Sequence, residues 1–259
     1  MTVAETAELA FDVMNATGTG PAVIICEHAS NHIPARYDGL GLDDAARASH
    51  AAWDPGAEAV ARLLGKALDA PLIAGRISRL VYDCNRPPDA PSAMPAQSET
   101  IAIPGNAALS EADRAERVRT VYAPFTQAVS DLIAQRKAQG TPFALITMHS
   151  FTPLWFGTPR SVEIGILHDD DSRLADSMLA EVHRLPHRQI ERNAPYGPAD
   201  GVTHTLRLHG LQNNLPNVMI ELRNDLLTTQ ADERAMAQEL ATLLRPALAH
   251  LGLQEQSDA

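Results

Sequence analysis

Cysteine is scarce in this sequence, which has only Cys26 and Cys84 and no C-x-x-C spacing between them. This excludes a disulfide framework as the basis of the fold and favours a reducing compartment. The N-terminal residues also lack the basic start, apolar core and small-residue cleavage site of a signal peptide. We therefore expect a cytoplasmic protein.

Long apolar runs and an excess of basic residues are also missing. No run approaches the roughly 20 residues that a membrane helix needs, so no membrane partner is expected. The 21 Lys and Arg residues are outnumbered by 32 Asp and Glu, which gives a formal net charge of −11. A nucleic-acid partner would require a basic patch and is not expected either. The content of 45% hydrophobic and 20% charged residues is typical of a globular protein and leaves the oligomeric state open.

Short apolar runs alternate with longer segments of helical periodicity, and this alternation predicts an α/β fold. Strands are expected at 22–28, 71–75, 78–84, 142–149, 161–168 and 217–223. Helices are expected within 42–70 (one, or two with a restart at Asp54-Pro55), 110–140, 172–185 and 231–252. Residues 87–109 should form a long connection of the kind that is functional or mobile. Together these elements predict a single domain, residues 1–259 with a core at about 20–252, built as a three-layer αβα fold around a mixed sheet.

Two histidines, His28 and His149, directly follow or end apolar runs, which places them at the carboxyl ends of strands. Open α/β sheets bind ligands at that edge, and two imidazoles there can converge on zinc, which needs a third protein ligand. Asp54, Glu27 and Asn31 are the candidates for the third ligand, and sequence spacing does not choose among them. In the alternative interpretation each histidine caps its strand, and Asp54, which precedes Pro-Gly, is a helix N-cap.

The segment SRLVYDCNR carries four residues suited to binding a carboxylate: Arg79, Asp83, Asn85 and Arg86. On a strand, Arg79, Asp83 and Asn85 would share one side. An arginine fork matches a carboxylate with two hydrogen bonds, and a neighbouring amide adds orientation. The alternative is a structural salt bridge between Asp83 and either arginine.

Glu221 lies in the otherwise apolar strand NVMIELR. A carboxylate there is costly unless it is paired or functional. Beside a metal site, a partly buried glutamate with a raised pKa is suited to act as general base. Arg223 faces the same side of the strand, where it would pair with Glu221 or bind a substrate carboxylate.

Several further residues are weaker candidates for contact with a ligand. His204 and His209 lie in a Gly-flanked polar stretch that could fold over the site, and Tyr196 lies in a similar loop. Trp155 and Phe156 follow the segment HSFTP and are expected to form the wall of a pocket.

Five segments in this order, spread over about residues 20–245, resemble the N-formylglutamate amidohydrolase family: CEHASN, AWDPGA, SRLVYDCNR, MHSFTP and IELRND. That family is similar to zinc carboxypeptidases and aspartoacylases, so the resemblance implies a phosphorylase/hydrolase-like αβα fold. It also implies zinc bound by His28 and by His149 of a His-Ser pair, a carboxylate grip by Asn85-Arg86, and Glu221 as base. Arg79 matches the arginine that polarises the scissile carbonyl.

The chain departs from its relatives at one ligand position. Carboxypeptidase-like enzymes carry a zinc-binding glutamate three residues after the first histidine, where this chain has Asn31. Asp54 is the preferred substitute, because an anionic ligand offsets the zinc charge better than a neutral amide. Asp83 and Ser150 are expected to orient the metal ligands from behind.

These residues lead to the hypothesis of a zinc-dependent amidohydrolase that cleaves N-formylglutamate or a related small-molecule N-acyl amino acid. Ligand types alone also allow iron, cobalt or manganese. One alternative is a metal-independent hydrolase with Ser150 as nucleophile and His149 or His209 as base, although no G-x-S-x-G turn surrounds Ser150. The other is a binding protein that keeps the Asn85-Arg86 grip without turnover.

Overall fold

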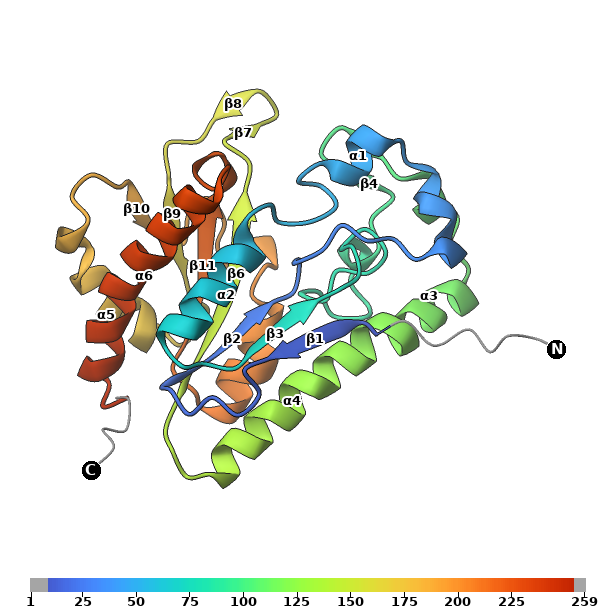
Figure 1. The fold of residues 1–259 in the computed structure, drawn as a ribbon. Coiled ribbons are helices and arrows are strands. Elements are labelled where there is room, and N and C mark those ends of the chain that lie inside the picture. The colour runs from blue at the N-terminus through green and yellow to red at the C-terminus, as the bar shows by residue number, and fades with distance from the viewer. Residues whose placement is uncertain (1–8, 254–259) are drawn as a thin grey trace.

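A seven-stranded mixed sheet forms the centre of the protein in the computed structural model, which describes residues 9–253 (Figure 1). The strand order is β1-β3-β2-β6-β11-β9-β10. These strands are β1 (Phe11–Met14), β2 (Ala22–Cys26), β3 (Leu72–Gly75), β6 (Ala144–Phe151), β9 (Ile164–Leu167), β10 (Ile190–Arg192) and β11 (Asn217–Arg223). The central strands β3, β2, β6 and β11 run parallel, whereas β1 and β9 pair antiparallel with β3 and β11. The prediction of an α/β fold with a mixed sheet is confirmed.

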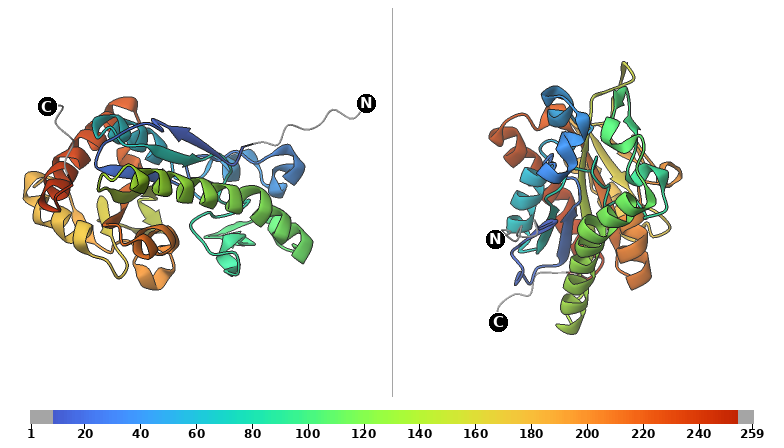
Figure 2. Two further views of the ribbon diagram at one scale, coloured as in Figure 1. Left: turned by 90° about the horizontal axis from the view of Figure 1, so that it is seen from below. Right: turned by 90° about the vertical axis from the view of Figure 1, so that its right-hand side faces the viewer.

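Helices cover both faces of the sheet because the parallel strands are apolar on both sides. In β2, Ile24 packs in one core cluster with α2 and α6, and its neighbour Val23 packs in a second cluster with α4. Figure 2 shows the sheet between these helices. The helices are α1 (Asp44–Ala48), α2 (Ala57–Ala67), α3 (Glu111–Arg117), α4 (Ala123–Ala138), α5 (Arg173–Ala180) and α6 (Gln230–His250).

The connections are short or carry small elements of their own. A π-helical turn at Val118–Tyr122 joins α3 to α4, so the expected long helix is present, and Ser110 and Asp113 form its capping box. The 87–109 connection contains the hairpin β4 (Gln97–Ser98) and β5 (Ile101–Ala102). A second hairpin, β7 (Leu154–Trp155) and β8 (Thr158–Pro159), follows β6.

Two local predictions are wrong. Residues 78–84 form turns rather than a strand, because the buried Ser78 hydroxyl bonds Ala52 and the Leu80 amide while the Val81 amide bonds Ser78. The 42–70 segment forms two helices, which is one of the two expected alternatives, but the N-cap residue of the second helix is Gly56 and not Asp54.

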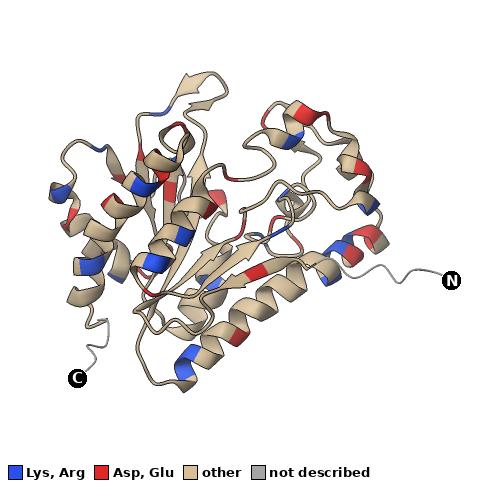
Figure 3. Cartoon of the chain, viewed as in Figure 1, with Lys and Arg blue, Asp and Glu red and all other residues tan. Residues whose placement is uncertain are grey.

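Charged residues of both signs lie along the helices that cover the sheet (Figure 3). No helix within residues 9–253 combines the length and the apolar character needed to cross a bilayer.

The packing of α6 on the sheet predicts the effect of truncating Leu240. This side chain is fully buried in the cluster shared with α2 and the sheet, so Leu240→Ala should lower the free energy of unfolding by about 2–5 kcal/mol. The exposed Leu154, replaced in the same way, should change it by less than about 0.5 kcal/mol. Urea unfolding measures both values, and equal small losses would contradict the packing described.

Candidate active site

Three adjacent parallel strands bring the main candidate residues to one edge of the sheet. His149 lies near the carboxyl end of β6, and Glu221 is its register partner on β11. His28 follows β2, which pairs with β6 on the other side. Because the carboxyl ends of parallel strands meet at one edge, residues far apart in the sequence become neighbours there.

Asp54 reaches this edge from the turn before α2. Its backbone amide donates to the His28 carbonyl at 2.9 Å, which ties the turn to the end of β2. Gly56 follows with a φ of 79°, and a Cβ atom there would lie 2.5 Å from the Leu227 side chain. Only glycine therefore allows the chain to enter α2 at this place.

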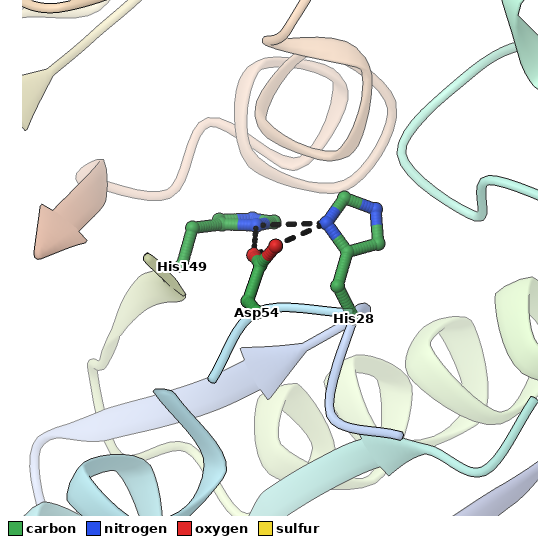
Figure 4. Close-up of side chains that lie close together, drawn as sticks. All are labelled: His28, Asp54 and His149. Carbon is green, nitrogen blue, oxygen red and sulfur yellow. Dashed lines mark hydrogen bonds and ion pairs between the residues drawn. The ribbon is translucent and has the colours of Figure 1, made fainter. Parts of the chain in front are cut away.

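His28, Asp54 and His149 point toward one another (Figure 4). The two Nδ1 atoms are 3.3 Å apart, and Asp54 Oδ2 lies 3.2 Å from His28 Nδ1 and 2.9 Å from His149 Nδ1. All three residues are buried. One ligand atom from each lies within 4.8 Å of the others, which is close enough to hold one metal ion.

The spacing of these three atoms fits a tetrahedral metal ion. Zinc takes nitrogen ligands at about 2.0–2.1 Å, which places ligand atoms of a tetrahedron about 3.3 Å apart. The opposite ring nitrogens face carboxylates: His28 Nε2 lies 2.7 Å from Asp83 Oδ1, and His149 Nε2 lies 3.2 Å from Glu27 Oε2. With their protons on Nε2, the two rings would direct both Nδ1 lone pairs at the same carboxylate oxygen. A cation between them offsets this repulsion, so the residues fit the group.

The other two candidates for the third ligand lie elsewhere. Glu27 is on the far side of the His149 ring, and neither carboxylate oxygen finds a hydrogen bond of good geometry within the described part of the chain. Burial opposes ionisation of Glu27, but the His149 imidazole holds its pKa below the usual value. Asn31 is exposed and donates to the Arg47 carbonyl. Of the three, Asp54 alone joins the two histidines.

Arg79 and Asp83 contact the cluster through Asp54 and His28. Arg79 Nη1 lies 3.3 Å from Asp54 Oδ1, and its Nη2 donates to Asp83 Oδ2 at 2.9 Å. Burial opposes ionisation of Asp83, but His28 and Arg79 hold its pKa well below the usual value. The expected salt bridge between Arg79 and Asp83 is present, although turns rather than a strand bring the two together.

Glu221 is a buried carboxyl group in β11. Its side chain lines the cavity that contains the cluster, and no described residue hydrogen-bonds its Oε2 atom. Burial raises the pKa of Glu221 to about 7. Tyr196 lines the same cavity, and burial and then the Glu221 charge raise the pKa of its hydroxyl group.

The expected carboxylate-binding residues occupy different surroundings. Asn85 lies in the cavity wall and holds residues 202–205 in place, because its amide donates to the Val202 carbonyl at 2.6 Å and accepts from the Thr205 amide at 3.0 Å. Arg86 also lines the cavity. Arg223 is not among the lining residues and instead lies 2.8 Å from Asp225.

Ser150 lines the cavity, and its hydroxyl group bonds to no imidazole of the described residues. Its backbone amide donates to Asp54 Oδ2 at 3.3 Å, and its hydroxyl donates to the Pro55 carbonyl at 2.8 Å. Both contacts hold the Asp54 turn against β6.

The cavity has a volume of about 820 Å³, which is enough for a small organic substrate. Trp155 and Phe156 stand in its wall, as expected, whereas His204 and His209 are not among its lining residues. Sequence reasoning missed Arg160 and His50, which also line it. A lone arginine or histidine in a polar loop carries no pattern that would single it out.

Comparisons with known proteins agree with this geometry. A model of the N-formylglutamate amidohydrolase family matches residues 20–228. A gene product of Agrobacterium tumefaciens of known structure is 52% identical and superposes with a TM-score of 0.93, over 96% of this chain and 98% of that one. The N-formylglutamate amidohydrolase of Ralstonia eutropha JMP134 is 18% identical and shares the fold, with a TM-score of 0.58 over 94% of this chain and 98% of that one. No curated protein matches the chain. The chain belongs to the N-formylglutamate amidohydrolase family.

Proposed function

We propose that this protein is a zinc-dependent amidohydrolase that releases a free amino acid from N-formylglutamate or a related N-acyl amino acid. Membership of the family supports a hydrolase that acts on amide bonds. The observation that supports the metal is the triangle of His28, Asp54 and His149, with edges of 2.9–3.3 Å. Asp83 lies next to Nε2 of His28, and Glu27 lies next to Nε2 of His149. Carboxylates in these positions orient imidazoles that bind a metal.

When bound, a divalent ion supplies a Lewis acid that polarises the acyl oxygen and acidifies water. Glu221 accepts the proton of the attacking water. Its buried carboxylate lines the cavity, and its Oε2 atom is free to accept a proton because no described residue bonds to it. As the water oxygen bonds to the acyl carbon and the C–N bond breaks, Glu221 returns that proton to the leaving nitrogen. The products are the carboxylate and the free amino group.

The arginines of the cavity position the substrate. Arg86 donates Nη1 to the Asn85 carbonyl and has no carboxylate partner among the described residues, so it can pair with the α-carboxylate. Asn85 lies beside Arg86 and uses one amide hydrogen to bond the Val202 carbonyl, so its second amide hydrogen can donate to the substrate. Arg79 is held by Asp54 and Asp83 and presents its remaining N–H groups to the developing oxyanion.

The geometry favours this function over a serine hydrolase. A nucleophilic serine needs an imidazole within hydrogen-bond reach. The Ser150 hydroxyl donates to the Pro55 carbonyl instead, and no imidazole of residues 9–253 bonds to it.

Three expectations from the sequence remain proposals. The first is that the chain folds as one domain. The second is that Arg223 binds the substrate, for which its side chain would have to leave the contact with Asp225 seen in this structure. The third is that the protein works in the cytoplasm, a proposal consistent with Cys26 and Cys84, which are free and buried.

Removal of the metal tests the proposed chemistry. Incubation with dipicolinate should abolish release of the amine from N-formyl amino acids, and added zinc should restore it. Amine release is assayed across N-formyl and N-acetyl derivatives of glutamate, aspartate and histidine. Unchanged activity in the chelated protein would contradict the metal mechanism. Bound zinc without turnover of any substrate would favour a binding protein.

Replacement of the base separates proton transfer from metal binding. Glu221→Gln removes the proton acceptor while keeping the size of the side chain, so kcat should fall by about 10²- to 10⁴-fold. The zinc content of the variant should stay at one ion per chain, because Glu221 is not one of the three ligands. Turnover within threefold of the unmodified enzyme would remove Glu221 from this role.

Replacement of Glu27 tests the support of His149. Glu27→Gln removes the anion that faces His149 Nε2, and zinc affinity should fall by about 10- to 100-fold. Competition with a fluorescent chelator measures the dissociation constant. Glu191→Gln on the exposed side of β10 serves as the matched control and should leave the affinity unchanged. Equal affinities in the two variants would show that Glu27 does not support the ligand.

A further inference from the structure

Arg160 is an arginine of the cavity wall that is held by aromatic rings. Its guanidinium carbon lies 4.8 Å from the ring centre of Trp155, 4.8 Å from that of Tyr196 and 5.5 Å from that of Phe151. Contacts with aromatic faces attract the cation without using its N–H donors. The rings therefore fix the guanidinium and leave its donors available.

One edge of this guanidinium has no partner among the residues that the structure describes. Nη1 donates to the Tyr196 hydroxyl at 2.9 Å and makes a long contact of 3.5 Å with the Thr152 carbonyl. Nε and Nη2 bond to nothing within residues 9–253, and no carboxylate of that range pairs with Arg160. The Nε–Nη2 edge matches the two oxygens of a carboxylate.

Two arginines of the cavity lack an ion pair within the described chain, although Glu221 and Asp200 also line the cavity. Of its three arginines, Arg79 forms ion pairs with Asp54 and Asp83, whereas Arg86 and Arg160 form no ion pair within the described chain. A buried or half-buried cation without a counter-ion is costly. Two carboxylates of one ligand would offset both charges.

The positions of the two arginines assign one carboxylate to each. Arg86 belongs to the turn that carries Asp83, the partner of His28, and its backbone amide donates to the Asp83 carbonyl at 3.0 Å. It therefore stands near the reacting amide, as an α-carboxylate does in an N-acyl amino acid. Arg160 follows the β7–β8 hairpin in a different part of the wall, where a longer side chain of the substrate can reach it.

We propose that Arg160 binds the side-chain carboxylate of an N-acylated dicarboxylic amino acid and so selects this class over neutral N-acyl amino acids. This assignment rests on the proposed function, because it takes the ligand of the cavity to be an N-acyl amino acid. Arg160 would thus provide a second carboxylate-binding site in addition to the one proposed for Arg86.

Binding measured without turnover tests this role. In the zinc-loaded Glu221→Gln background, calorimetry compares N-formyl-L-glutamate with N-formyl-L-glutamine, which has the same shape but no side-chain charge. The glutamate derivative should bind more tightly by about tenfold or more. Adding Arg160→Met should weaken it by about 10- to 100-fold, the loss expected for a charged pair. The glutamine derivative should change by less than about threefold.

Two further variants control for effects on structure. Arg160→Lys keeps the charge without the fork and should lose an intermediate amount of glutamate affinity. Arg234→Met, on α6 outside the cavity, should leave both affinities unchanged. If Arg160→Met does not fold, as judged by circular dichroism, the Lys variant and an Arg160→Gln variant decide the question in the same way.

The outcomes separate this inference from the proposed function. Equal weakening of both ligands, or no preference for the glutamate derivative, would overturn the role of Arg160. Turnover of N-formyl amino acids by the unmodified enzyme, measured in parallel, would still support the proposed function in that case. Absence of any such turnover would overturn the proposed function, while an Arg160-dependent preference for the dicarboxylate would still stand as binding selectivity.

Discussion

Two imidazole nitrogens and one carboxylate oxygen share a buried space only a few ångströms across, and most other features of the site follow from this arrangement. Removing such groups from water is costly unless their charges and hydrogen bonds are matched. Asp83 and Glu27 face the outer nitrogens of His28 and His149, and Arg79 bridges Asp54 to Asp83. Three possible ligand atoms therefore converge on one point, and acidic and basic side chains surround them. A divalent cation bound there would offset the close approach of these atoms, which is why we propose a metal site.

The residues of the site lie on two kinds of element, the central strands and the loops of the cavity wall. His149 and Glu221 are register partners on two adjacent strands buried on both faces, which fixes the distance between the proposed metal ligand and the proposed base. The residues proposed to contact the substrate, Arg86 and Arg160, lie in turns and beside a hairpin. In the proposed mechanism the reacting groups are therefore carried by strands and the substrate-binding groups by loops, where residues can change without disturbing the His28–Asp54–His149 cluster.

The sequence predicted the elements that carry strong periodicity. The strand at residues 217–223 matches β11 to the residue, and Ser110 marks the start of the long helix through its capping box. The segment 78–84 has the apolar content of a strand but forms buried turns, because the Ser78 hydroxyl supplies hydrogen bonds that a sheet neighbour would otherwise make. Apolar content reports burial and does not distinguish a strand from a buried turn.

Site residues could be predicted from the sequence where they follow an expected strand or belong to a family motif. The third ligand needed the structure, since Asp54, Glu27 and Asn31 are all near His28 along the chain and only distances separate them. Arg160 could not be found at all, because the rings that hold it come from Phe151, Trp155 and Tyr196 in separate segments.

The position of the metal ion is the most direct test of this account. Crystals grown with zinc and measured on both sides of the zinc absorption edge give an anomalous difference map. We expect one strong peak in contact with His28 Nδ1, His149 Nδ1 and Asp54 Oδ2. A peak on the Nε2 side of either ring, or no peak at these residues at full zinc occupancy elsewhere, would contradict the central claim.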